Sequence, residues 1–316
     1  MSDKKIITVI GATGAQGGGL VRAIQSDPSG AFRARALTRD PNSDKAKELA
    51  ALGAEVVQGD LDNAESIAAA FRGAYGAFGV TFFWAHYSAE RETAEAKLMA
   101  EAAKAEGVQH FIWSTLEDVR KYIPLSDTRM PTIHGKYKVP HFEGKADGDV
   151  FFAQNGVPTT YLLTAFYWEN LIYFGMNPKP DGQGRYAFTI PMGNGHLSGI
   201  AAEDIGKCAY GIFKQGGALI GERVGIAGDH VTGADMAATM ARIMGKDIYY
   251  NAMPFDAYRA LGFPGADDLG NMFQFYHDCE AEFTAKRNLD FTRHLNPELQ
   301  SFNAWVEANK DRIPLA

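Results

Sequence analysis

The stretch Val9-Ile10-Gly11-Ala12-Thr13-Gly14-Ala15-Gln16-Gly17 decides the fold of this 316-residue chain. An apolar run over 6–10 predicts a buried strand before it, and a helical pattern follows over 15–26. Glycines at this spacing permit a tight turn, a close approach of backbone to a pyrophosphate, and close packing of helix against strand. The helix N-terminus adds N–H donors and a positive dipole end. Between a strand and a helix, these glycines indicate a dinucleotide-binding turn over an ordinary glycine-rich one.

The same alternation of apolar runs and helical stretches continues outward from this turn. Further strands are expected over 33–38, 55–58, 75–80 and 109–114, with helices over 43–52, 63–71 and 88–106 between them. Strands that alternate with helices at this spacing form right-handed βαβ units and a mainly parallel sheet. We therefore predict an α/β fold with a Rossmann-type, doubly wound parallel sheet.

The second half of the chain has a different pattern. Residues 117–140 form a polar, proline-containing stretch, which is expected to be a functional loop because long loops in compact domains usually are. A helix over 140–155 and a sixth strand over 159–163 follow it. Short strands are expected over 186–190 and 223–226, and helices over 202–213, 233–244 and 266–283. The predicted domains are a cofactor-binding Rossmann domain, 1–170, and a smaller α+β lobe for substrate or partner, 171–316, partly interleaved with the sheet.

Composition excludes several classes of function. The net charge is −7, and no cluster of Lys and Arg is present, which argues against direct nucleic-acid binding. The two cysteines, Cys208 and Cys279, have no metal-binding spacing and do not suggest a disulfide framework. There is no apolar run of about 18 residues and no signal-peptide pattern, so we expect a cytoplasmic protein that does not bind membranes.

The end of the second predicted strand indicates which dinucleotide is bound. An NAD site places an acidic residue there to accept a hydrogen bond from the ribose 2′-hydroxyl. This chain has Arg39 instead, whose guanidinium pairs with a 2′-phosphate, and Lys45 adds further positive charge. NADP(H) is therefore favoured. After the third strand, Asp60 is suited either to border the adenine or to cap the next helix.

The residues expected near the reacting end of the cofactor depart from the usual reductase pattern. Short-chain dehydrogenases place a serine after the fifth strand and a Tyr-x-x-x-Lys motif one helix later, with tyrosine as the general acid. Here Ser114 and Lys145 are in position, but His141 replaces the tyrosine, and Tyr137 is eight residues before the lysine. His141 can transfer protons or simply pack at a helix end. Lys145, His141 and Ser114 are the candidate catalytic residues, and no metal is expected.

Several segments together resemble the NmrA-like family of atypical short-chain dehydrogenases, and the resemblance runs nearly end to end. They are Gly-Ala-Thr-Gly-Ala-Gln-Gly-Gly, Leu-Thr-Arg-Asp-Pro, Pro-His-Phe-Glu-Gly-Lys, Phe-Tyr-Trp-Glu-Asn-Leu and the late segments 260–266 and 271–276. The resemblance implies NADP(H) binding, often without the Tyr-x-x-x-Lys set. It also implies that some members are redox-responsive regulators, which bind a partner protein according to the state of the cofactor.

The resemblance also implies cofactor contacts by position. They are Gly11, Ala12, Thr13, Gly14, Ala15, Gln16, Arg39, Asp60 and Leu61, the turn Thr81-Phe82-Phe83 beside the nicotinamide, Lys145 on the ribose, and Tyr167-Trp168-Glu169-Asn170 closing over the nicotinamide end. Two positions depart from animal members of the family. Phe82 replaces a polar residue, and Ala94 replaces a lysine for which Lys97 is a candidate substitute.

Two functions follow as alternatives. The first is an NADP(H)-dependent redox sensor with weak or no dehydrogenase activity, whose cofactor state controls binding of a protein partner. The second is an NADPH-dependent reductase of an aromatic, enone, quinone or imine small molecule. Its atypical site would be centred on Lys145, or on water held by Ser114 and His141, and lined by Phe82, Phe83, Trp84 and Tyr167. Whether the protein is an enzyme stays open, as does the choice between monomer and homodimer.

Overall fold

A seven-stranded parallel sheet organises the first part of the computed structural model, which describes residues 4–315. Its order is β11-β6-β5-β4-β1-β2-β3, and every neighbouring pair is parallel. The strands are β1 (Lys5–Val9), β2 (Phe32–Thr38), β3 (Glu55–Gln58), β4 (Gly76–Gly79), β5 (His110–Thr115), β6 (Thr159–Leu163) and β11 (Arg223–Gly225). The order reverses between β1 and β4, which is where doubly wound sheets bind their ligands. The predicted Rossmann-type fold is confirmed.

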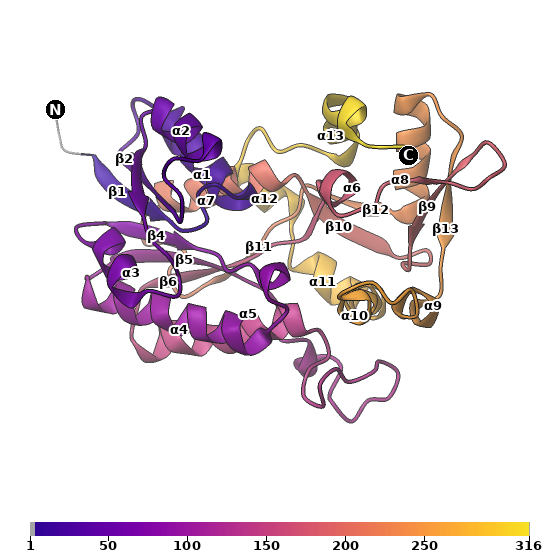
Figure 1. Cartoon of the computed structure of the whole chain (residues 1–316), viewed down its shortest axis with the longest axis horizontal. Coiled ribbons are helices and arrows are strands. Elements are labelled where there is room, and N and C mark those ends of the chain that lie inside the picture. The colour runs from indigo at the N-terminus through magenta and orange to yellow at the C-terminus, as the bar shows by residue number, and fades with distance from the viewer. Residues whose placement is uncertain (1–3, 316) are drawn as a thin grey trace.

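Two layers of helices cover the sheet (Figure 1). One layer holds α1 (Ala15–Gln25), α2 (Asp44–Ala51), α7 (Ala202–Lys214) and α12 (Leu289–Leu295), and the other holds α3 (Ala64–Phe71), α4 (Ala89–Ala105) and α5 (Pro140–Gln154). Glycines let the helices within each layer approach closely. A Cβ on Gly206 would lie 2.0 Å from Leu20 N between α7 and α1, and one on Gly148 would lie 2.5 Å from Ala96 Cβ between α5 and α4. These contacts bring α7, from the later half of the chain, against the first helix.

A smaller lobe with two three-stranded sheets faces the carboxyl ends of the parallel strands. The first sheet has β12 (Asp229–Thr232), β10 (His196–Ile200) and β7 (Phe166–Tyr167), and the second has β13 (Ile248–Ala252), β9 (Tyr186–Ile190) and β8 (Lys179–Pro180). The helices of the lobe are α6 (Asn170–Tyr173), α8 (Gly233–Met244), α9 (Phe255–Arg259), α10 (Ala266–Asp278), α11 (Glu280–Ala285) and α13 (Phe302–Asn309). Since β11, α7 and α12 return to the large sheet, the two halves of the chain interleave (Figure 1).

One helix prediction is wrong. The expected helix over 266–283 is two helices, α10 and α11, because Cys279 leaves the helical region with φ −118° and ψ 29°. The change of direction packs the Phe283 ring against Tyr276 and Phe275, at centroid distances of 4.5 and 5.7 Å. Tertiary packing therefore overrides the helical pattern of this segment.

The predicted loop 117–140 is anchored to the lobe. Lys138 is fully buried, and its Nζ donates hydrogen bonds to Asp127 O at 2.8 Å and Met130 O at 2.7 Å. From α10, Asn271 Nδ2 donates to Pro131 O and Lys138 O at 2.9 and 2.6 Å. The loop is thus held by its own buried lysine and by α10.

Across residues 4–315, no helix combines the length and apolar character needed to cross a membrane.

A buried arginine joins the start of this loop to the lobe, and we expect its replacement to lower the free energy of unfolding. Arg287 is fully buried, donates to both carboxylate oxygens of Glu117 at 2.7 and 3.1 Å, and donates to Thr164 O at 3.0 Å. Arg287→Met leaves Glu117 buried without its partner, so we expect the free energy of unfolding in urea to fall by roughly 3–5 kcal/mol. Arg293→Met, which breaks an exposed ion pair to Asp290, should change it by less than about 0.5 kcal/mol. Equal effects of the two changes would contradict the prediction.

Candidate functional site

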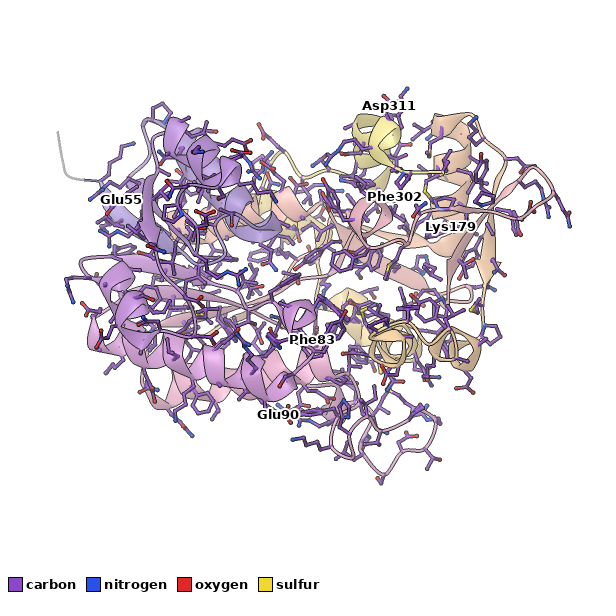
Figure 2. The ribbon with its side chains drawn as sticks, viewed as in Figure 1. Glu55, Phe83, Glu90, Lys179, Phe302 and Asp311 are labelled. Carbon is purple, nitrogen blue, oxygen red and sulfur yellow. The ribbon has the colours of Figure 1, made fainter. Side chains whose placement is uncertain are left out.

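A cavity of about 1210 Å³ lies at the carboxyl ends of the parallel strands, between the large sheet and the lobe. Its walls include the turn after β1, the turn after β4, the start of α5 and the segment after β6. In Figure 2, two lining residues are labelled, Phe83 from the Rossmann side and Lys179 from the lobe. Open α/β sheets bind their ligands at this edge.

The turn after β1 has the geometry that a pyrophosphate requires. Gly11 has φ +68°, which favours glycine, and Gly14 N donates to Gly11 O at 2.9 Å. A Cβ on Gly17 would lie only 2.4 Å from Gly11 O, so only glycine lets α1 begin this close to the turn. Gly14 caps α1 without a side-chain acceptor, which leaves the first N–H groups of the helix available to an anion. The residues present therefore fit a dinucleotide phosphate.

Most of the predicted site residues meet in the cavity. Those that line it are Gly11, Ala12, Thr13, Gly14, Ala15, Gln16, Thr81, Phe82, Phe83, His141, Lys145, Tyr167, Glu169 and Asn170. Those outside its lining are Gly17, Arg39, Asp60, Leu61, Ser114 and Trp168. Gly17 does not line the cavity, but its lack of a side chain lets α1 pack closely against the turn.

Lys145 is the buried cation of the site. Its Nζ donates to Thr81 O at 3.0 Å and to Thr81 Oγ1 at 2.6 Å, and it lies 2.9 Å from Glu92 Oε2. The Trp113 ring lies 5.8 Å from the same Nζ. These contacts hold the ammonium at the turn after β4, where the family resemblance predicts the nicotinamide end of the cofactor. Sequence reasoning missed Glu92, which nothing in the local pattern of α4 distinguishes from its other glutamates.

Ser114 is committed to a structural hydrogen bond, so its predicted catalytic role is not supported. The residue is 2% exposed, and its Oγ donates to Gln16 Oε1 at 2.8 Å. Gln16 Nε2 in turn donates to the Tyr167 hydroxyl. These two hydrogen bonds orient Gln16 at the phosphate turn. Gln16 lines the cavity, whereas Ser114 does not. Burial raises the pKa of Tyr167 to about 12, so this tyrosine is a poor replacement for the missing general acid.

His141 is held in one orientation by an aspartate from the lobe. Its Nδ1 lies 2.5 Å from Asp268 Oδ1, and its backbone N–H donates to Asp268 Oδ2 at 3.1 Å. The rings of Trp84 and Phe83 flank the imidazole at 5.0 and 5.9 Å. Because Asp268 engages Nδ1, Nε2 is the nitrogen left to exchange a proton with a ligand. The sequence did not reveal Asp268, since it begins a helix 127 residues away.

The predicted adenosine end of the site carries exposed positive charge. Arg39 is exposed at the end of β2, and Lys45 from α2 lines the cavity. The alternative that Asp60 caps α3 is wrong, because Asn63 is the cap and accepts from Ser66 N at 3.1 Å. Asp60 Oδ1 instead accepts from Asp62 N within the turn, at 3.1 Å.

Two further predictions are corrected by burial and exposure. Trp168 is fully buried and packs against Phe302 and Trp305, so it does not close over the nicotinamide. Tyr167, the last residue of β7, lines the cavity, whereas Trp168 begins the following turn and packs into the core of the lobe. Lys97 is about half exposed, pairs with Glu101 and lies outside the cavity, so it does not replace the lysine missing at Ala94.

Comparison with known proteins agrees with this geometry. The profile of the NmrA-like family matches residues 3–303. The chain belongs to the NmrA-like family. It is 30% identical over 289 residues to the NmrA-like family domain-containing oxidoreductase FrzB of a Cladobotryum species, covering 85% of this chain and 83% of that one. It is 27% identical over 284 residues to the oxidoreductase lnaB of Aspergillus flavus, covering 86% and 84%.

Solved structures share the fold. NmrA, a negative transcriptional regulator, in complex with NADP has a TM-score of 0.78 at 25% identity, covering 96% of this chain and 94% of that chain. Triphenylmethane reductase of a Citrobacter species, complexed with NADP(H), has a TM-score of 0.73 at 19% identity, covering 96% and 99%. The predicted nicotinamide-dinucleotide cofactor is thus confirmed for the NmrA-like family, and the cavity at the glycine turn is where this member has the residues to bind it.

Proposed function

We propose that this NmrA-like protein is an NADPH-dependent oxidoreductase of a bulky, apolar, aromatic molecule. The observation that carries the proposal is the character of the cavity beyond the glycine turn. The exposed large apolar side chains of residues 4–315 are nine, and seven of them line this cavity: Leu52, Phe82, Tyr87, Tyr173, Phe174, Leu261 and Phe263. Apolar side chains gathered at a cavity mouth mark a ligand-binding groove, because their exposure costs free energy until a ligand covers them.

The cofactor end of the proposed site is built from charge and backbone. The glycine turn and the first N–H groups of α1 would hold the pyrophosphate, and Arg39 with Lys45 would hold the 2′-phosphate. Lys145, beside Thr81, would hold the nicotinamide ribose. When bound, NADPH supplies a hydride to the substrate.

A proton must accompany the hydride, and His141 is the residue placed to give it. Its Nδ1 is engaged by Asp268, so a protonated His141 would donate through Nε2 to the substrate atom that gains charge. Asp268 keeps the ring in one orientation, as the aspartate of a catalytic triad does for its histidine. Lys145 is less suited to this step, since its ammonium donates to both oxygens of Thr81 and is paired with the Glu92 carboxylate.

Relatives support both this proposal and the alternative. FrzB and lnaB, which match most of this chain, are named oxidoreductases. A redox sensor, the second candidate, is supported by the likeness to the regulator NmrA and by the lack of a tyrosine at position 141. In a sensor, the two conformations of the protein must differ in their relative affinity for NADPH and NADP⁺, because a ligand shifts a conformational equilibrium only by binding one state more tightly.

Turnover with a panel of quinones, enones and aromatic imines tests the proposal, with loss of NADPH absorbance as the signal. We expect at least one compound to be reduced, and we expect His141→Gln to lower kcat by about 10²- to 10⁴-fold, the range for loss of a general acid. The NADPH dissociation constant should change less than about threefold, because His141 does not hold the cofactor. His196→Gln, which alters an exposed histidine outside the cavity, is the matched control.

Two outcomes would overturn the proposal. One is a reduction rate in His141→Gln equal to that of the control. The other is the absence of turnover together with affinities for NADPH and NADP⁺ that differ by about tenfold or more, which would support the sensor.

A further inference from the structure

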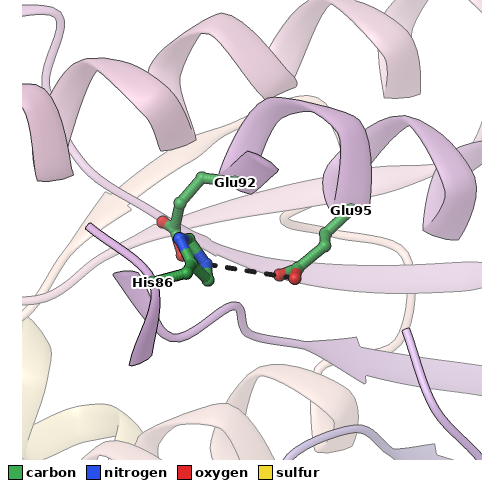
Figure 3. Close-up of side chains that lie close together, drawn as sticks. All are labelled: His86, Glu92 and Glu95. Carbon is green, nitrogen blue, oxygen red and sulfur yellow. Dashed lines mark ion pairs between the residues drawn. The ribbon is translucent and has the colours of Figure 1, made fainter. Parts of the chain in front are cut away.

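Three titratable side chains meet behind Lys145, outside the lining of the cavity. Nitrogen and carboxylate oxygen atoms of His86, Glu92 and Glu95 all lie within 4.8 Å of one another. Figure 3 shows Glu92 and Glu95 on one helix, α4, with the His86 ring facing both. The Glu92 side chain is fully buried, and neither of its carboxylate oxygens accepts a hydrogen bond from the described residues. Such a group is costly unless it serves a nearby charge.

A bound metal does not explain the cluster. Ser88 N–H donates to His86 Nδ1 at 3.1 Å, so the neutral ring carries its proton on Nε2, the atom that faces the carboxylates. A metal would need the Nε2 lone pair. Two cations already balance the two carboxylates, because Lys145 Nζ lies 2.9 Å from Glu92 and Arg91 Nε lies 3.1 Å from Glu95.

We propose that Glu92 is a positioning residue, whose buried carboxylate stabilises the Lys145 ammonium and aims it at Thr81, where the cofactor would be held. The proposal rests on the cofactor-holding role of Lys145 in the proposed function. Lys145 is 9% exposed, and burial disfavours an ammonium that has no anion beside it. Thr81 offers Lys145 two neutral oxygens, and Glu92 is the carboxylate that the structure places in contact with it.

The other two members of the cluster, His86 and Glu95, do not compete for the ion pair between Glu92 and Lys145. Burial lowers the pKa of His86, which favours its neutral form, and Glu95 is paired with Arg91 at 3.1 Å. Other titratable groups near Lys145 have partners of their own: His141 binds Asp268, Tyr167 binds Gln16, and Asp149 binds Arg223. Glu92 is thus the anion expected to stabilise the Lys145 ammonium.

The pH dependence of NADPH binding tests the proposal. In Glu92→Gln, the buried Lys145 ammonium has no anion beside it, so burial favours its neutral form and its charge is lost as the pH rises. We expect the NADPH dissociation constant of Glu92→Gln to rise about tenfold or more between about pH 7 and pH 9.5, because a charged hydrogen bond to the ribose is lost. The wild type should change little over the same range. Glu95→Gln is the matched control, since it alters a neighbouring buried glutamate that is paired with Arg91.

The outcomes separate this inference from the proposed function. Binding is measured by fluorescence without substrate, so a failure to find turnover leaves the test intact. A flat pH response in Glu92→Gln, or equal responses in Glu92→Gln and Glu95→Gln, would overturn the role of Glu92. If Glu92→Gln does not fold, Glu92→Asp decides, because it retains the charge and should bind NADPH without a new alkaline loss. A thermal shift with Zn²⁺ that disappears in His86→Gln would contradict the charge balance and overturn the proposal.

Discussion

Replacing Arg39 with glutamate is expected to weaken NADPH binding by about 100-fold or more, while NADH binding changes far less. The change removes charge-assisted hydrogen bonds to the 2′-phosphate, worth about 1.5–3 kcal/mol, and adds like-charge repulsion. Arg39 is exposed at the end of β2, and its side chain has no hydrogen bond or ion pair to another residue of 4–315. Its loss should therefore leave the fold intact. Titration of both cofactors against the purified variant measures the effect.

Arg33→Glu is the control for Arg39→Glu. Arg33 lies on β2, the strand that Arg39 directly follows, pairs with Glu55 at 3.1 Å, and is also exposed. The two variants have the same net charge, so any difference between them reports the local contact and not the overall field. If both weaken NADPH to the same extent, or if Arg39→Glu weakens NADH as strongly as NADPH, Arg39 does not read the 2′-phosphate.

Gly17→Ala is the second change with a large expected effect. In an ordinary helix, alanine is more favourable than glycine by roughly 0.5–1 kcal/mol, so helix propensity alone predicts a gain in stability. Here the added Cβ would lie 2.4 Å from Gly11 O and 3.0 Å from Ala12 N. Backbone atoms cannot rotate away as a side chain can, so α1 or the turn must move. We expect a loss of about 1–3 kcal/mol in the free energy of unfolding, in the range for overpacking.

The same shift should remove most of the cofactor affinity. The N–H groups of the turn and of α1 would leave the positions that a pyrophosphate requires, so we expect the NADPH dissociation constant to rise about 100-fold or more. Urea unfolding and cofactor titration measure the two effects separately. Gly217→Ala is the control, because its Cβ would meet only Ile220 Cδ1, at 3.6 Å. A stable Gly17→Ala variant with normal NADPH affinity would show that the turn tolerates a side chain.

Local patterns were enough to predict the Rossmann sheet. The strands β3, β6 and β9 have their predicted bounds, and β1, β2 and β4 agree to within one or two residues, because each is a short segment with buried apolar side chains bounded by turn residues. The lobe was harder, since strands as short as β7 and β8 carry no periodicity to detect.

The sequence by itself determined the cofactor turn, because glycine spacing, the preceding strand and the following helix all lie within a few residues of one another. Only the tertiary structure decided the surroundings of the reacting end. Asp268 reaches His141 across 127 positions, and Gln16 reaches Tyr167 across 151. The tertiary structure also shows that Ser114 and Trp168, both predicted site residues, do not line the cavity. The physical reason is that periodicity indicates which side of an element is buried, whereas the packing of the lobe on the sheet selects the partner it is buried against.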